Sequence, residues 1–169
     1  MNDTYCELIV KRKIGSTALL SRFLVVFATV VAMFLGFAMF HVFGIMAGCF
    51  LIYLDIIVFR NTDTEYEYQF ISGDLDIDCI YGKMKRKKAK HFDMRRIELL
   101  APLKSGEFAS YDHNKKIKIM DYSSGYDDRP KYAFIVPTDD NEIAKVIFEP
   151  NEEMVNAIKM IAPSKVHMY

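Results

Sequence analysis

Residues 23–54 restrict the fold more than any other part of the chain, because they contain no Asp, Glu, Lys or Arg. One membrane-spanning helix needs about 20 apolar residues, so this block is too long for a single crossing. With its flanks it suits two helices, near residues 17–40 and 45–59, joined by a tight turn around residues 41–44. We therefore expect a transmembrane α-helical hairpin.

The charges around this hairpin predict its orientation. Lys and Arg close to membrane ends stay on the cytoplasmic side. Here they all flank the outer ends of the two helices, whereas the turn offers only His41. The flanking cations are Lys11, Arg12, Lys13, Arg22 and Arg60. We expect a multi-pass protein of the cell membrane with both termini in the cytoplasm.

The hairpin divides the 169-residue chain into three parts. Residues 1–16 are expected to form a cytoplasmic juxtamembrane lead, 17–60 the two transmembrane helices and 61–169 a cytoplasmic domain. Alternatively, residues 5–10 lie on that domain as a short extra element. The first 60 residues hold five basic and three acidic side chains (+2), which leaves 17 basic and 19 acidic (−2). This near-neutral balance argues against a nucleic-acid partner.

After residue 60 the apolar period changes to two, which is typical of β-strands. Tyr66, Tyr68 and Phe70 alternate with polar residues, and further strand-like segments follow up to residue 148. Asn151 and the acids after it then predict a helix start, followed by one apolar stripe. The soluble part thus reads as an all-β or α+β domain of six or seven antiparallel strands with a C-terminal amphipathic helix.

Three segments carry a resemblance to a known family: NDTYCELIVKRK at the start, EYEYQFISGDLDIDCIYGKMKRKK after the hairpin, and IELLAP further on. With two membrane helices before the strands and the terminal helix, the chain resembles an uncharacterised family of small clostridial membrane proteins with a bacterial pleckstrin-homology-like (PH-like) cytoplasmic domain. The resemblance implies this architecture over nearly the whole chain. It implies no activity and no catalytic residues.

A basic run is the sharpest functional signal in the sequence. Its members are Lys83, Lys85, Arg86, Lys87, Lys88 and Lys90. Each cation near an anionic leaflet contributes about 1 kcal/mol, so the run predicts a site for anionic lipid head groups or a protein partner. Alternatively, it offsets the acids of neighbouring strands, at about 0.2–1 kcal/mol for each pair. Both interpretations stay open.

Asp55 is the one acid of the second predicted crossing, and in an antiparallel hairpin it falls level with Thr29. An ionisable residue inside a membrane is by default a candidate functional site. Alternatively, Asp55 reaches the interface or bonds to Thr29. We favour this second interpretation.

The sequence predicts no catalytic residues, metal site or cofactor. Asp74, Asp76 and Asp78 begin like a calcium loop, but Cys79 and Lys85 occupy the positions that require Gly and Glu. We therefore expect a non-enzymatic, membrane-anchored adaptor that binds anionic lipid or a partner protein, with a groove beside the terminal helix as a first site. Homo-oligomerisation of the hairpin is left open. The alternative is a small oligomeric channel or transporter subunit with Asp55 facing an internal cavity.

Overall fold

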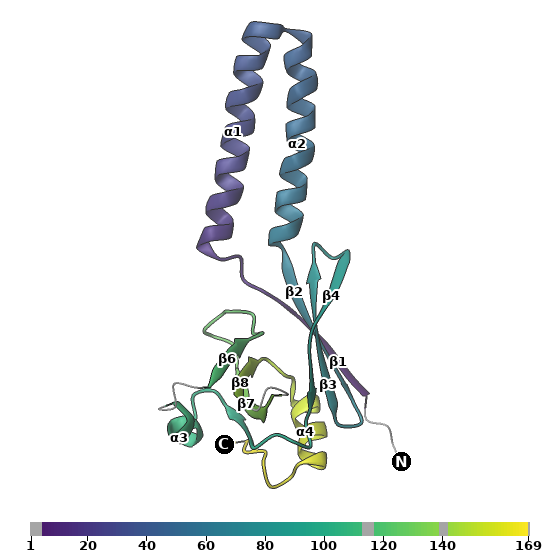
Figure 1. Ribbon diagram of the computed structural model, residues 1–169, viewed down its shortest axis with the longest axis vertical. Coiled ribbons are helices and arrows are strands. Elements are labelled where there is room, and N and C mark those ends of the chain that lie inside the picture. The colour runs from purple at the N-terminus through teal and green to yellow at the C-terminus, as the bar shows by residue number, and fades with distance from the viewer. Residues whose placement is uncertain (1–4, 113–116, 139–141, 169) are drawn as a thin grey trace. The chain divides into compact units, whose positions relative to one another are not determined.

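The computed structural model describes residues 5–112, 117–138 and 142–168 (Figure 1). The chain divides into two compact units. One comprises the chain up to Arg12, Glu65–Ile80 and the residues from Arg86 onward, and the other comprises Lys13–Thr64 and Tyr81–Lys85. We describe each unit by itself.

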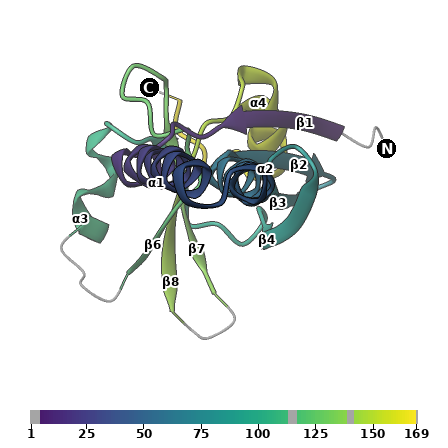
Figure 2. The same cartoon turned by 90° about the horizontal axis from the view of Figure 1, so that it is seen from above.

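The second unit is built on a helical hairpin. Helices α1 (Ser16–Phe40) and α2 (Val42–Thr62) lie side by side in both views (Figures 1 and 2). The turn is shorter than expected, because His41 alone separates the helices, in a left-handed conformation with φ 51°. The amide of His41 ends α1 by donating to the carbonyl of Phe37, and the carbonyl of His41 accepts from Ile45 in the first turn of α2.

Small residues let the two helix backbones approach each other. A Cβ on Gly44 would lie 2.2 Å from the carbonyl carbon of Gly36, and one on Gly48 would lie 2.5 Å from the side chain of Met33. Both helices are long and apolar enough to cross a membrane, and only 6% and 17% of their most apolar windows are buried. This exposure is unlike that of a soluble core helix and suggests membrane association.

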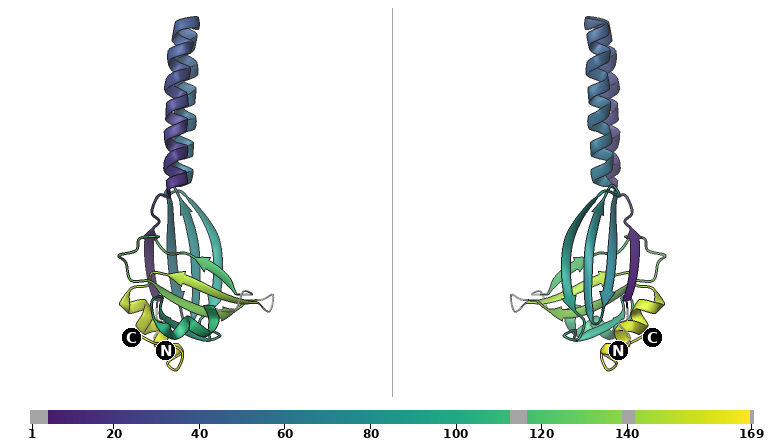
Figure 3. Two further views of the ribbon diagram at one scale, coloured as in Figure 1. Left: turned by 90° about the vertical axis from the view of Figure 1, so that its left-hand side faces the viewer. Right: turned by 90° about the vertical axis from the view of Figure 1, so that its right-hand side faces the viewer.

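The first sheet has the order β1-β2-β3-β4 (Figure 3). Its strands are β1 (Tyr5–Lys11), β2 (Thr64–Ile71), β3 (Asp74–Tyr81) and β4 (Lys85–Asp93). Strand β1 pairs antiparallel with β2, from Tyr5 opposite Ile71 to Lys11 opposite Glu65. The expected lead therefore contains a strand of the sheet, and the helical hairpin is an insertion between two neighbouring strands.

The second sheet has the order β5-β7-β8-β6. Its strands are β5 (Leu99–Pro102), β6 (Lys118–Asp121), β7 (Tyr132–Pro137) and β8 (Ile143–Phe148). The described residues thus form eight strands where six or seven were expected. Strand β6 runs parallel to β8, against the expectation of an antiparallel set. The reason is that β7 and β8 form a hairpin, and the chain crosses from β6 on one side of β8 to β7 on the other.

The strands of the second sheet run across those of the first (Figure 3), and aromatic side chains fill the space between them. The rings of Phe92 and Phe134 meet edge to face at 5.2 Å, and those of Phe134 and Phe148 at 5.3 Å. Helix α4 (Glu152–Ile161) begins as expected, since the side chain of Asn151 accepts from the amide of Met154. Its apolar stripe is buried in the same core. The short helices η1 (Gly106–Phe108) and α3 (Ala109–Asp112) follow β5.

Candidate functional site

Most of the basic run lies on β4, an edge strand of the first sheet. Two of its cations pair with acids of the same sheet: Arg86 with Glu67 of β2, two strands away, at 2.6 Å, and Lys88 with Asp76 of the adjacent β3 at 2.8 Å. The charge-balancing interpretation therefore describes these two residues. Lysines on an edge strand also discourage pairing with another chain.

The other four cations of the run are Lys83, Lys85, Lys87 and Lys90. All are exposed, and none forms an ion pair with a carboxylate of the described residues. Two cations of the run therefore balance acids of the sheet, whereas the other four are exposed and can contact a ligand.

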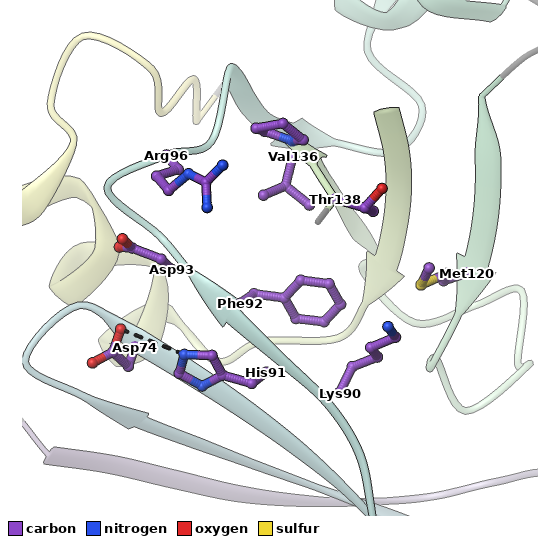
Figure 4. A pocket seen from close by; sticks show the side chains of 10 residues that line it. Asp74, Lys90, His91, Phe92, Asp93, Arg96, Met120, Val136 and Thr138 are labelled. Atoms are coloured by element: carbon purple, nitrogen blue, oxygen red, sulfur yellow. Dashed lines mark ion pairs between the residues drawn. The ribbon is translucent and has the colours of Figure 1, made fainter. Parts of the chain in front are cut away.

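Lys90 lines a cavity of about 330 Å³ in the first unit (Figure 4). Strands from both sheets supply the walls, and polar and apolar side chains share the lining. The lining residues are Asp74, Lys90, His91, Phe92, Asp93, Arg96, Met120, Val136, Pro137 and Thr138. Figure 4 shows Phe92 and Val136 facing the same space as Lys90 and Arg96.

Arg95 lies just outside this lining and forms ion pairs with both acids of the cavity. Its guanidinium lies 3.0 Å from Asp74 and 2.8 Å from Asp93. Burial alone would raise the pKa of Asp93, but the bonds from Arg95 outweigh burial and lower it. Arg95 balances one of the two carboxylates, and the charge of Arg96 also acts on Asp93. With Arg95 counted, three cations face two acids, so the cavity keeps a net charge of +1.

His91 extends the polar wall of the cavity. Its Nδ1 lies 2.9 Å from Asp76, and its Nε2 lies 3.9 Å from Asp74 (Figure 4). Burial would raise the pKa of Asp76, but hydrogen bonds from Lys88 and His91 lower it. Asp76 therefore stays ionised, and His91 is held against the acids of β3.

The apolar side of the cavity comes from Phe92, Met120, Val136 and Pro137. Such a site can hold an anionic group against Lys90 and Arg96 while an attached apolar portion contacts the floor. Sequence reasoning found Lys90 but not the residues from β6 and β7. No local pattern in the sequence links Met120 or Thr138 to β4. Arg95 and Arg96, which follow β4, were the only sequence signal for further residues of this site.

Comparison with known proteins identifies the family. The model of a family described as Bacterial PH-like domain (DUF6106) matches residues 2–168. The chain belongs to this PH-like family. The match runs through the helical hairpin as well as the strands. No curated protein and no solved structure was found to match the chain.

The edge of β5 in this PH-like domain is already occupied by the C-terminal segment. Val166 bridges to Leu100 in parallel, with bonds of 2.8 Å from Leu100 to the carbonyl of Lys165 and from His167 to the carbonyl of Leu100. A cavity of about 380 Å³ lies beside α4, and its lining comes from this same C-terminal segment together with Glu107 and Lys159. A partner strand at the β5 edge would therefore have to displace the chain's own C-terminal segment.

The structure brings the predicted intramembrane pair together. The hydroxyl of Thr29 donates to the carboxylate of Asp55 at 3.1 Å, and Thr29 is 6% exposed. This is the contact expected from the antiparallel level of the two helices, and it ties α1 to α2 within the apolar hairpin.

A buried acid in the PH-like domain escaped the sequence analysis. The alternation of β2 placed Glu67 on a solvated face, but its side chain is 0% exposed and bonds to Arg86. Burial raises the pKa of Glu67, and the nearby Glu7 of β1 raises it further. The hydroxyl of Tyr5 donates to Glu7 and lowers the pKa of that second carboxyl. The sequence analysis allowed residues 5–10 as an extra element on the domain but did not pair them with β2, so the cover of Glu67 by β1 was not foreseen.

Proposed function

We propose that this protein is a non-enzymatic, membrane-anchored adaptor whose PH-like domain binds an anionic group in the cavity beside β4. The excess of cations (Lys90, Arg95 and Arg96) over acids (Asp74 and Asp93), beside an apolar floor, carries the proposal. A charge-assisted bond from Arg to carboxylate or phosphate is about twice as strong as a neutral hydrogen bond.

The membrane anchor in this proposal is the helical hairpin, which lies in the lipid bilayer. The register of the sheet supports a hairpin that brings the chain back to the side of the membrane from which it started. Lys11, at the end of β1, lies opposite Glu65, near the start of β2. The basic residues flanking the hairpin support a cytoplasmic location of this side and of both termini. The protein is then a multi-pass component of the cell membrane.

The ligand in this proposal carries phosphate or carboxylate. A lipid head group and an acidic segment of a partner protein both present such groups, and Lys85 and Lys87 add attraction to either. Their contribution falls as salt screens them, with a Debye length of about 8 Å at physiological ionic strength.

The test uses the full-length protein in nanodiscs of neutral lipid, titrated with inorganic pyrophosphate and with a hexaglutamate peptide. The Lys90→Gln/Arg96→Gln variant is compared with Lys104→Gln/Lys118→Gln, which removes the same charge from outside the cavity. We expect a salt-sensitive affinity that falls at least tenfold in the first variant only, since about 1.4 kcal/mol is tenfold. Equal affinities in all three proteins would refute the proposed site. The preferred probe identifies the ligand class.

A further inference from the structure

A second cationic cavity lies within the other unit, at the end of the hairpin where the chain enters α1 and leaves α2. Its volume is about 310 Å³. The lining residues are Arg22, Ile56, Phe59, Arg60, Asp63, Gly82 and Lys83. Three cations from three separate segments thus converge beside two apolar side chains, with Asp63 as the acid of the lining.

The position of Arg22 on α1 is held by α2. Its Nε donates to the hydroxyl of Thr62 at 2.7 Å, its Nη2 donates to the carbonyl of Phe59 at 3.1 Å, and its guanidinium lies 5.0 Å from the centre of the Phe59 ring. These contacts preorganise the charge, so a ligand does not need to order this side chain.

The turn between β3 and β4 brings Lys83 to the same place. The amide of Gly82 donates to the carbonyl of Asp63 at 2.8 Å. A Cβ at residue 82 would lie 2.4 Å from Cγ of Arg60, so only glycine permits this approach. Lys83 itself has a positive φ of 58°, an uncommon conformation for a residue with a side chain. Met84, next to it, is 75% exposed.

We infer that this cavity binds the phosphate of an anionic glycerophospholipid, with an acyl chain along Ile56 and Phe59. The inference rests on the proposed crossing of the membrane by α1 and α2, which places both helix ends at head-group level. Charge complementarity selects the occupant: Arg22, Arg60 and Lys83 against Asp63 leave the lining with a net charge of +2. The two apolar residues belong to the apolar length of α2, where the acyl region of a lipid begins.

The inference is tested on the full-length protein by native mass spectrometry from a neutral detergent. Phosphatidylglycerol, phosphatidylcholine and soluble glycerol phosphate are added separately. The Arg60→Gln/Lys83→Gln variant is compared with Lys104→Gln/Lys118→Gln, which removes the same charge from exposed residues outside the lining. Gly82→Ala keeps every charge and displaces the turn from Arg60. Circular dichroism checks that each variant is folded.

We expect retention of phosphatidylglycerol by the wild type and by Lys104→Gln/Lys118→Gln, and an affinity about 30-fold lower in Arg60→Gln/Lys83→Gln. This factor corresponds to about 1 kcal/mol for each of two cations. A loss in Gly82→Ala supports placement of Lys83 by the turn. Equal loss in both double variants, equal binding of phosphatidylcholine, or equal binding of glycerol phosphate would each overturn the inference.

The two proposals fail separately. The Arg60→Gln/Lys83→Gln protein is also titrated with pyrophosphate and hexaglutamate in neutral nanodiscs, where unchanged binding shows that the cavity beside β4 is intact. Lipid selectivity without binding of either probe would refute the function assigned to that cavity and leave the lipid site standing.

Discussion

Excision of the hairpin should leave a folded soluble domain, whereas truncation before β2 should not. In the first protein, residues 13–63 are replaced by Asn-Gly, a dipeptide that favours tight β-hairpins. In the second, the chain starts at residue 61, the boundary that the sequence predicts for the domain. The two proteins differ chiefly in β1, which only the first retains.

The magnitude follows from what β1 buries. Cys6 and Val10 are 5% and 6% exposed in the main core, and Leu8 packs against it. Full burial of a Val or Leu side chain contributes about 1.5–3 kcal/mol. Because Leu8 is only half-buried and Cys6 is smaller, we take about 4 kcal/mol for the three together. A domain of this length has a total stability of roughly 5–15 kcal/mol. Loss of β1 should therefore remove a large share of it.

Urea denaturation followed by circular dichroism measures the difference, since the chain has no tryptophan. We expect a cooperative transition for the excised protein. The truncated one should have a free energy of unfolding lower by about 4 kcal/mol, or no transition. A Val10→Ala change in the excised protein should give an intermediate loss. Equal midpoints for the excised and truncated proteins would show that β1 does not support the sheet.

Three further predictions concern single side chains. Tyr68→Phe removes a buried hydroxyl that donates to a backbone carbonyl at 2.6 Å, and urea denaturation should show a loss of about 1–2 kcal/mol; an unchanged midpoint would contradict the bond. Asp76→Asn should lower the free energy of unfolding by about 0.5–1 kcal/mol at neutral pH. Because the pKa of Asp76 is lowered by folding, this contribution exists above its ordinary value of 3.8 and disappears as pH falls through the folded value, so a difference that persists in acid would refute it. Asp55→Asn keeps an acceptor for Thr29 and should leave probe binding unchanged in nanodiscs, whereas loss of an ion flux in proteoliposomes would establish the channel or transporter alternative.

Periodicity predicted the local elements of this fold well. The apolar block gave two helices, and the cap at Asn151 marked the start of α4. The second helix was expected to begin at residue 45, but it begins at Val42, because a single left-handed residue suffices for the turn. Such elements depend on neighbours in sequence, which is why a pattern can find them.

Pairing between strands that lie far apart in the sequence was harder to predict. Strand β1 lies beside β2 across the whole hairpin, and its short apolar cluster resembled a juxtamembrane lead. The burial of Glu67 was missed for the same reason. Alternation along β2 shows which of its side chains share a face, but not which other residues cover that face. The candidate site was found only through Lys90, because part of its wall comes from β6 and β7 of the other sheet, which no local pattern links to β4.

The insertion of the hairpin between β1 and β2 has a consequence for biosynthesis. Strand β1 is synthesised before β2, and its partner β2 follows only after both helices have been made. A chain in which only one helix entered the bilayer would hold β1 and β2 on opposite sides, and the sheet could not close. If both helices cross the membrane as proposed, completion of the sheet depends on correct insertion, and we expect a misinserted chain to stay unfolded and open to proteolysis.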